Sequence, residues 1–413
     1  MTGQPATSRW YRAHVINRRP RTVGTVTLTD DQARHLWNWT LSRQGLHPHR
    51  RLTSAAEISH AALGLHAARL PSPFATVAAR ATDASAALAL LDHTPGLTTL
   101  RCMRRTLHLL PVDLAATAHR ATAHYRLRDA ARRAHNAGVT QQQIDQIGTR
   151  LHSLLADGPM PYRQIEADLQ TATAGTAAVR ATVKTAWEAG SLTYRNASGC
   201  WNAEHRLFGL TSQLHPSLDL DLDPRTATRI LIQAYFDRYG PATLTDATWW
   251  SALSRAAILD ALDDPAAAVL EVATPWSSSP AYMFAERYEQ FTAADADTHA
   301  TGLHLLAHED VALKAYAETR TRYLADLAPR DAFNQIGEAL PTVLVDGQVH
   351  GTWTWNPATR SVTTTLLPDR TTPALTRQTA HAADQHTAAL RTGWRSHSAA
   401  RSRPHPGQLA LAV

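Results

Sequence analysis

Residues 64–73 read GLHAARLPSP and place His66 near the end of an Ala-rich segment that is predicted to be helical. Histidine gains or loses a proton near neutral pH, so its type and position make it a candidate for acid–base chemistry. The alternative is a partly buried histidine at a helix end that serves only packing. Both interpretations stay open on these ten residues alone.

The other histidines raise the question of a metal site, because the chain has 22 of them. One group lies among basic residues and comprises His119, His124 and His135. Their spacings of five and eleven residues do not place them on one face of a helix, which argues against a shared metal ion. His304 and His308 have the i,i+4 spacing of a helical chelate, but Glu309 and Asp310 beside them favour surface ion pairs.

The familiar patterns of cofactor and metal chemistry are missing from the sequence. There is no Walker A loop, no GxGxxG after a predicted strand, no GxSxG elbow and no HExxH. Cys102 and Cys200 are the two cysteines, without a CxxC pair, so we predict small buried apolar residues and no thiolate zinc site. We therefore expect no cofactor and no metal.

The distribution of charge points to a polyanionic partner. Arginine supplies 39 of the 41 basic side chains, and the two lysines are Lys184 and Lys314. Residues 1–60, 95–135 and 369–413 carry +6, +6 and +4, which leaves −10 for the rest because the whole chain is +6. Basic segments in an otherwise acidic chain are typical of a nucleic-acid-binding face. Solvated helix surfaces plus two unstructured tails are the alternative.

Length and hydropathy limit the class of protein. At 413 residues the chain has room for two to four domains of about 100–200 residues. No stretch approaches the roughly 18 consecutive apolar residues of a membrane helix. The N-terminal arginines are not followed by an apolar segment either, so we predict a cytoplasmic protein without membrane contact.

The elements that position His66 are predicted from periodicity and capping. A strand at 23–28 precedes a helix that a Thr29–Gln32 capping box opens. A second helix is expected at about 54–68, followed by a loop at the prolines and a further helix at about 74–79. Under this interpretation, His66 lies in the last turn of the second helix.

Residues 99–110, TLRCMRRTLHLL, interleave apolar and basic side chains and are predicted to form one strand. Alternation along that strand would put Arg101 and Arg105 on one face, and Arg104 and His108 on the other. Arg104 and His108 would then reach DNA together. A solvated basic strand is the alternative.

Two later stretches repeat one order of elements, which is a short helix, a second helix and β structure. The first copy has YRQIEADL at 162–169, a helix at 177–192 and the alternating LTYRNASGCWNAEHRLFGL. The second has DATWWSAL at 246–253, a helix capped by Ser254 and the strand AVLEVATPW. This is the order of a winged helix, and residues 23–110 fit a more decorated third copy. The expected fold class is mainly α with small β elements (α+β), in tandem winged-helix units that form a curved DNA-binding arrangement.

Residues 341–357, PTVLVDGQVHGTWTWNP, predict a hairpin around Asp346-Gly347, since a type I′ turn needs positive φ at both central residues. Residues 361–368 supply a third strand, 374–392 a helix, and 393–413 a basic tail without regular structure. Gln348 and His350 follow the turn and would enter a DNA groove if the hairpin approaches DNA. A hairpin packed on its own domain is the alternative.

Five segments, taken in order and spacing, resemble the AlkZ/YcaQ-type bacterial DNA glycosylases over about residues 25–392. They are GLHAARLPSPF, LRCMRRTLHLLP, YGPATLTDATWW, LHLLAHEDVALKAYAETR and PTVLVDGQVHGTW. The resemblance implies tandem winged helices that hydrolyse bulky N7-alkylguanine adducts and unhook interstrand crosslinks. It also implies self-protection in a genotoxin-producing bacterium, with double-stranded DNA as the partner of a monomeric protein near the nucleoid.

The resemblance further implies where the chemistry lies. The family carries a Gln-apolar-Gln or Gln-apolar-Asp group after Gly-Leu, and here His66, Ala67 and Ala68 stand at those positions after Gly64-Leu65. His66 would hold the attacking water near C1′, whereas Ala68 has no polar group. Arg69 would attract phosphate. Three outcomes are open: His66 suffices, another side chain replaces the missing partner, or the protein binds lesions without cutting.

The expected divisions follow from these elements and the resemblance. They are a basic arm at 1–22, winged helix 1 with the active-site loop at 23–138, winged helix 2 at 139–224, winged helix 3 at 225–300, a β element at 301–368 with its hairpin at 341–357, and a C-terminal helix with a basic tail at 369–413. A non-catalytic winged-helix protein for lesion binding or transcriptional regulation is the second functional hypothesis, and Ala68 favours it.

Overall fold

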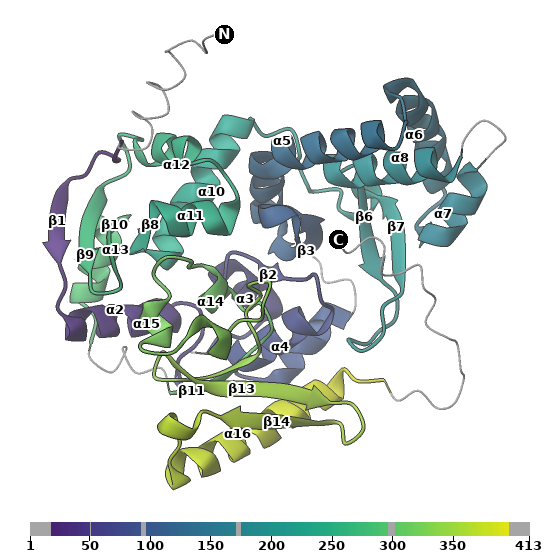
Figure 1. The fold of residues 1–413 in the computed structure, drawn as a ribbon. Coiled ribbons are helices and arrows are strands. Elements are labelled where there is room, and N and C mark those ends of the chain that lie inside the picture. Colours follow the sequence, from purple (N-terminus) through teal and green to yellow (C-terminus); the bar gives the residue numbers. More distant parts are fainter. Residues whose placement is uncertain (1–17, 50, 92–95, 171–174, 296–301, 396–413) are drawn as a thin grey trace, which may run out of the picture.

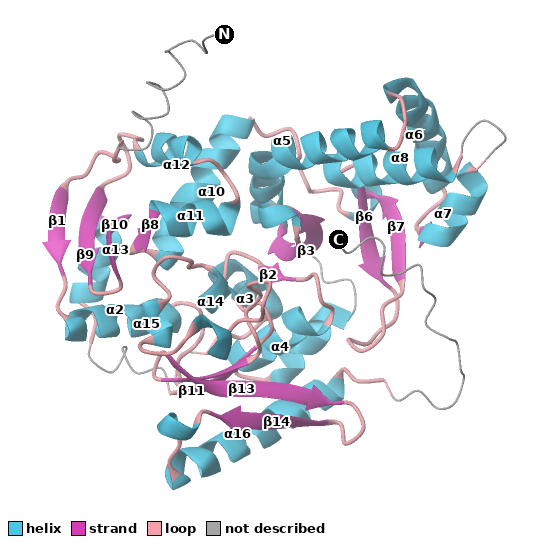
Figure 2. Cartoon of the chain, in the orientation of Figure 1, coloured by secondary structure: helices cyan, strands magenta, loops and turns pink. Residues whose placement is uncertain are grey.

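Helices and four small sheets build the computed structural model, which describes residues 18–395 except 50, 92–95, 171–174 and 296–301 (Figures 1 and 2). Most of the expected basic arm at 1–22 and of the tail at 393–413 lies outside the described residues. The described residues of the arm contact Asp263. Arg18 forms an ion pair with its carboxylate, and the backbone N–H of Arg21 donates to the same carboxylate.

One winged-helix order is complete between residues 141 and 210. Its elements are α6 (Gln141–Leu155), β5 (Met160–Pro161), α7 (Tyr162–Leu169), α8 (Thr176–Ala189), β6 (Leu192–Asn196) and β7 (Arg206–Leu210). The strands lie in the order β5-β7-β6, so the short strand after the first helix pairs with the last strand. A capping box of Thr140 and Gln143 opens α6.

The same order recurs in the following segment. Its elements are α10 (Pro224–Tyr239), β8 (Ala242–Thr243), α11 (Leu244–Ser251), α12 (Arg255–Leu262), β9 (Val269–Thr274) and β10 (Ser277–Phe284). Strand β10 again lies between the short strand β8 and β9. The N-terminal strand β1 (Gly24–Thr27) forms as expected, but it pairs in parallel with β9 and extends this sheet rather than that of the preceding segment.

The N-terminal segment follows the order a third time. Its elements are α3 (Ala55–Ala61), β2 (Leu65–His66), α4 (Pro71–Arg80), the 3-10 helix η1 (Ala84–Leu91), β3 (Leu97–Arg101) and β4 (Leu107–Pro111). The sheet order β2-β4-β3 matches the other two. Helix α2 (Asp30–Ser42) precedes this segment and has the predicted Thr29–Gln32 capping box. The predicted fold class, mainly helical with small sheets in winged-helix units, is confirmed.

Two local predictions around the candidate residues are wrong. The helix expected through residue 68 ends at Ala61, because Leu63 and Gly64 take positive φ values of 48° and 94° and turn the chain into β2. The strand expected at 99–110 is instead the hairpin β3–β4, closed by the 3-10 turn η2 (Met103–Arg105). His66 therefore lies in a strand, and the proposed alternation of Arg104 and His108 on one face does not apply.

The C-terminal part forms an antiparallel sheet with a covering helix, drawn at the bottom of Figure 1. Its strands are β11 (Leu303–Leu306), β12 (Thr342–Val345), β13 (Gln348–Asn356) and β14 (Ser361–Leu366), and the helix is α16 (Pro373–Thr392). The predicted hairpin turn is confirmed, since Asp346 and Gly347 have φ values of 46° and 80°. Short helices complete the chain: α9 (Thr211–Leu214), α13 (Ala285–Thr292), α14 (Val311–Lys314) and α15 (Thr321–Leu324).

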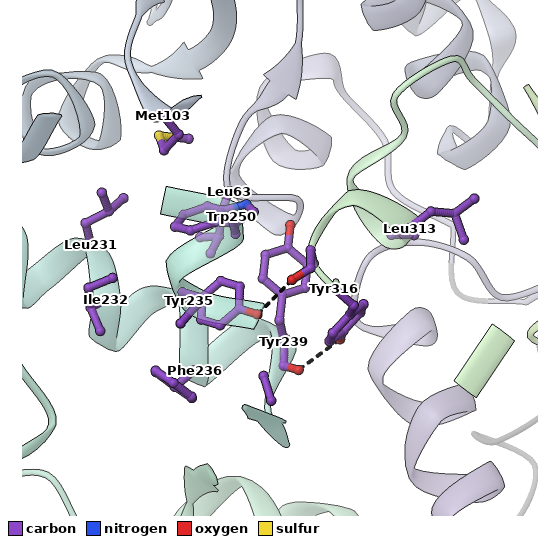
Figure 3. Packing of buried hydrophobic residues seen from close by; sticks show 14 of the residues in the cluster. Leu63, Met103, Leu231, Ile232, Tyr235, Phe236, Tyr239, Trp250, Leu313 and Tyr316 are labelled. Carbon is purple, nitrogen blue, oxygen red and sulfur yellow. Dashed lines mark hydrogen bonds between the residues drawn. The ribbon is translucent and has the colours of Figure 1, made fainter. Parts of the chain in front are cut away.

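The long helix α5 (Val112–Asn136) packs against both α8 and α10 and so joins the winged-helix units. Beside it, tyrosines of α10 make a core that Figure 3 shows. The Tyr239 hydroxyl donates to Ala62 O at 2.6 Å, and the Tyr316 hydroxyl donates to Tyr239 O at 2.8 Å. Because Ala62 is the C-cap residue of α3, this core fixes the backbone just before Gly64 and His66.

Two further predictions concern the burial of the cysteines and the hydropathy of the helices. Cys102 and Cys200 are both buried, as predicted for small apolar residues. Among the described residues, no helix is long and apolar enough to cross a bilayer.

Candidate active site

Strand β2 places the His66 side chain on one face of the sheet β2-β4-β3. Strand β2 pairs antiparallel with β4, so that His66 lies opposite His108 and the two rings meet edge to face at 5.7 Å. Gly64 is required for this approach, because a Cβ there would lie 2.4 Å from Leu110 Cδ2 and its φ is 94°. The neighbours Leu65 and Ala67 point to the other face.

The loop between β11 and α14 brings Glu309 to the same place. Asp310 caps α14 and forms a two-point ion pair with Arg80 of α4, and neither side chain is exposed. Glu309 has a positive φ of 58°, a region that residues other than glycine rarely occupy, and its N–H donates to Ala339 O. Arg80, Asp310 and Ala339 therefore set the position of the Glu309 side chain.

Two cationic side chains and two other groups surround the Glu309 carboxylate, whose side chain is 3% exposed. Its Oε1 accepts the Ala339 N–H at 2.6 Å and lies 3.0 Å from Lys314 Nζ. Its Oε2 lies 3.8 Å from His66 Nε2 and 3.9 Å from Arg104 NH1. The site thus combines an imidazole, a carboxylate and an ammonium, which are groups suited to proton transfer and charge stabilisation.

Burial sets the protonation state of the histidines. Desolvation, reinforced by nearby His108, His308, Arg104 and Lys314, lowers the pKa of His66 well below its usual value. Desolvation also lowers the pKa of His108 to about 4, against a hydrogen bond with the Thr106 carbonyl that raises it. Both rings are therefore neutral near pH 7. Neutral His66 can accept a hydrogen bond from water, and it is a weaker base than the sequence suggested.

Lys314 keeps its charge despite burial. Desolvation and nearby Arg104 lower the pKa of Lys314 to about 8, while the Glu309 carboxylate acts in the opposite direction. An ammonium with this pKa is mainly protonated at neutral pH. Trp249 of α11 lies beneath it, with Lys314 Nζ at 4.9 Å and Arg104 Cζ at 4.4 Å from the ring centroid. The winged-helix segment at 224–284 therefore contributes the aromatic side of the site.

The site opens to solvent through a polar rim. Side-chain exposure rises from 3% at Glu309 and 9% at His66 to 25% at Arg104 and 56% at Arg69. Arg69 NH2 bonds to Glu338 Oε2 at 2.9 Å, and His308 Nε2 lies 3.3 Å from the same oxygen. Glu309 and His66 are thus the buried members of a polar group whose more exposed members are arginines.

Ala68 is exposed and apolar, two residues beyond His66 at the rim. It therefore supplies no functional group to the site. The polar atoms beside His66 come instead from the 308–314 segment and from the β3–β4 turn.

The basic residues predicted on the β3–β4 segment separate into different environments. Arg101 Nε bonds to Glu188 Oε1 at 2.8 Å, and its guanidinium stacks over Trp187. Arg101 therefore joins the N-terminal winged-helix segment to the one at 141–210. His108 is 8% exposed and contacts His66 and Cys102, beneath the surface. Arg105 is exposed. The joint approach of Arg104 and His108 to DNA is not supported, since His108 is buried.

The hairpin at 341–357 packs on its own protein at the turn. Trp37 Nε1 of α2 donates to Gly347 O at 2.7 Å, and a Cβ at Gly347 would lie 2.4 Å from Asn38 Oδ1. Beyond the turn, Gln348 is half-buried, and His350 Nδ1 lies 3.3 Å from the Arg370 carbonyl. The packed alternative therefore describes this turn.

Sequence reasoning missed Glu309 and Lys314, because it treated LHLLAHED as a helix with surface ion pairs. That interpretation is wrong: residues 303–306 form strand β11, His304 is 3% exposed, and His308 lies beyond the strand end. One signal was present in the composition. Each of the two lysines binds a buried glutamate, Lys184 Nζ to Glu188 at 2.8 Å and Lys314 Nζ to Glu309 at 3.0 Å.

Among the described residues, neither a metal cluster nor the cavity beside Trp201 lies at this site. In the part of the chain that the structure describes, no three His, Cys, Asp or Glu side chains gather as metal ligands. A cavity of about 490 Å³ is lined by residues including Ala67, Thr99, Leu109 and Trp201. Ala67 and Leu109 face away from His66 and His108, so this cavity lies across the sheet from the buried polar groups.

The winged-helix order recurs three times in this chain, and a buried His–Glu–Lys group lies beside the N-terminal copy, which defines a winged-helix protein with a candidate active site. The chain belongs to the AlkZ-like family of DNA glycosylases, since the model of that family, described as DNA glycosylase AlkZ-like, matches residues 60–392. The DNA glycosylase AlkZ of Streptomyces sahachiroi is similar in structure, with a TM-score of 0.68 and 24% identity over 88% of this chain and 97% of that chain. That likeness shows the shared fold. No match was found among the curated protein sequences compared.

Proposed function

We propose that this protein is an active DNA glycosylase that hydrolyses the N-glycosidic bond of bulky N7-alkylguanine adducts or interstrand crosslinks. Its role would be repair or self-resistance to a genotoxin. One observation carries the proposal: His66 lies beside buried charged groups, at the position where the family resemblance puts the water-holding residue. Buried ionisable groups with shifted pKa values cluster at functional sites.

The chemistry requires little from the protein, because the substrate is already activated. An N7-alkylated guanine is cationic, so its bond from N9 to C1′ breaks without protonation of the base. The bonding electrons return to the guanine and neutralise it, while a water oxygen bonds to C1′ and releases a proton. His66, whose pKa is lowered, accepts a hydrogen bond from that water and orients it.

The more exposed arginines of the site can contact a phosphate backbone. Arg104 at 25% exposure and the exposed Arg105 are neighbours in the β3–β4 turn, where both have positive φ. Arg69 at the rim is held by Glu338 and can exchange that partner for a phosphate. We propose that these three arginines contact the DNA backbone beside the lesion.

A non-catalytic lesion-binding protein is the second candidate, and Ala68 is the observation that favours it. Position 68 is exposed and carries only a methyl group, so the second polar residue implied by the resemblance is absent there. Binding without cleavage would still use the same arginines. The two candidates differ in whether the adducted base leaves the DNA.

The experiment compares base release by the wild type with release by a variant. A duplex with one N7-benzylguanine is incubated with protein, and the free modified base is quantified by mass spectrometry against a sample without protein. We expect release by the wild type and, for His66→Ala, a rate lower by about 100-fold or more. Tight binding without release would favour the second candidate, and equal rates would remove His66 from the mechanism.

A further inference from the structure

We infer that Glu309 is the second catalytic group of this site, and that its carboxylate supplies what the side chain at position 68 lacks. The inference rests on the proposed glycosylase function and assigns a residue to it. In three dimensions, Glu309 and not Ala68 is the polar neighbour of His66: Glu309 Oε2 lies 3.8 Å from His66 Nε2, whereas Ala68 is exposed at the rim.

The backbone holds Glu309 in an unfavourable conformation that other contacts enforce. Its φ of 58° belongs to the left-handed region, which a side chain with a Cβ disfavours. The adjacent Asp310 is fixed by Arg80, and the backbone of Glu309 is fixed by Ala339 O. Strained residues with several such restraints cluster at functional sites, and here the result is a carboxylate directed at His66.

The two carboxylate oxygens have different tasks. Oε1 accepts the short hydrogen bond from the Ala339 N–H and faces Lys314, so these two contacts orient the group. Oε2 has His66 Nε2 and Arg104 NH1 at 3.8 and 3.9 Å, distances longer than a hydrogen bond. Among the described residues, Oε2 is therefore a charged acceptor without a short protein donor.

Oε2 and His66 Nε2 are close enough for both to contact one water molecule. In the reaction, the water oxygen bonds to C1′ and its proton passes to Oε2, while the bond from C1′ to N9 breaks and its electrons neutralise the alkylguanine. The proton later leaves Glu309 to solvent. The negative charge of Oε2 also stabilises the positive sugar that develops as the base departs.

A purely structural role is the rival explanation, since Glu309 bridges Lys314 and the Ala339 N–H. The chain offers a matched control for it in Glu188, whose side chain is 4% exposed and which binds the other lysine, Lys184, at 2.8 Å. Glu188 lies in α8 and also bonds to Arg101 and Arg126. Loss of charge at Glu188 therefore tests what a broken buried pair does by itself.

Glu309→Gln and Glu188→Gln are compared in single-turnover release of N7-benzylguanine, together with DNA affinity and thermal unfolding. Glutamine at 309 keeps an oxygen for the Ala339 N–H and removes the charge. We expect both variants to lose stability, Glu309→Gln to slow release by about 100-fold or more at unchanged DNA affinity, and Glu188→Gln to release base at the wild-type rate.

If Glu309→Gln does not fold, the double variant Glu309→Gln/Lys314→Met removes both charges, with Glu188→Gln/Lys184→Met as its control. A folded variant of Glu309 that releases base at the wild-type rate overturns the inference. A Glu309 variant whose slower base release is explained entirely by weaker DNA binding also overturns the inference. Absence of release by the wild type would overturn the proposed function, and this inference with it.

Discussion

Arg80 and Asp310 form an ion pair through two hydrogen bonds of 2.8 and 2.6 Å, although 230 residues separate them in the sequence and both side chains are fully buried. This pair ties helix α4 to the loop that carries Glu309. Since α4 follows His66 closely in the chain, the pair also fixes the relative position of His66 and Glu309. The position of the candidate site therefore depends on a contact between two segments that are distant in the sequence.

Removal of one partner should be strongly destabilising, because the other would stay buried as an unpaired charge. We expect Asp310→Asn or Arg80→Met to lower the free energy of unfolding by about 3–5 kcal/mol, measured by urea denaturation. Base release should fall as well, since Glu309 loses its anchor. The double change Arg80→Met/Asp310→Leu leaves no unpaired charge and should recover part of the stability; no recovery would contradict this explanation.

Gly64 should tolerate no side chain. An alanine Cβ would lie 2.4 Å from Leu110 Cδ2, at a φ of 94° that alanine disfavours. We expect Gly64→Ala to lower the free energy of unfolding by about 1–3 kcal/mol and to displace His66. Gly138→Ala is the matched control, because Gly138 has a φ of 70° and nothing within 4 Å of an added Cβ. Equal losses in the two variants would show that the contact with Leu110 is unimportant.

Stability should fall as the solution becomes acidic, because several histidines are buried in the neutral form. Desolvation, with a smaller effect of Arg51, lowers the pKa of His386 from 6.5 to about 4. The unfolded chain therefore binds more protons than the folded chain in this window, and stability declines as pH falls from 6.5 toward 4. His386→Phe keeps a ring against Trp353, which lies at 5.0 Å, and should flatten the decline in urea midpoints. An unchanged slope would contradict the assignment.

Two arginines of the β3–β4 hairpin should behave differently. Arg105 is exposed, so Arg105→Ala should weaken DNA binding on every sequence and reduce the slope of log affinity against log salt by about 0.9. Arg101 bonds to Glu188 and stacks on Trp187, so Arg101→Ala should lower stability and leave that slope unchanged. Binding titrations at several salt concentrations, with unfolding curves for both variants, measure the contrast. The reverse pattern would place the DNA on the other side of the hairpin.

Local signals made much of the fold predictable. The capping boxes at Thr29–Gln32 and Thr140–Gln143 form as their spacing indicates, and Asp346-Gly347 makes the expected turn. Such features depend on residues a few positions apart. The order of helices and strands, repeated along the chain, was enough to indicate winged-helix units.

The site was less predictable, since it depends on contacts between distant segments. Strand β1 joins a sheet whose other strands follow more than 200 residues later, and periodicity carries no information about that pairing. Glu309 reaches His66 only because Arg80 binds Asp310. The error at His66 has a local cause: positive φ at Leu63 and Gly64 ended a helix whose apolar spacing continued. An expected helix-end histidine is in fact a strand residue facing a carboxylate.

The central claim is that His66 and Glu309 act together on a water molecule at C1′. Single-turnover release of N7-benzylguanine by the wild type, His66→Ala, Glu309→Gln and the double variant tests it most directly. If the two groups act as one unit, each single change slows release by about 100-fold or more, and the double change is little worse than either. Release at the wild-type rate by either folded single variant, or losses that multiply in the double variant, would contradict the claim.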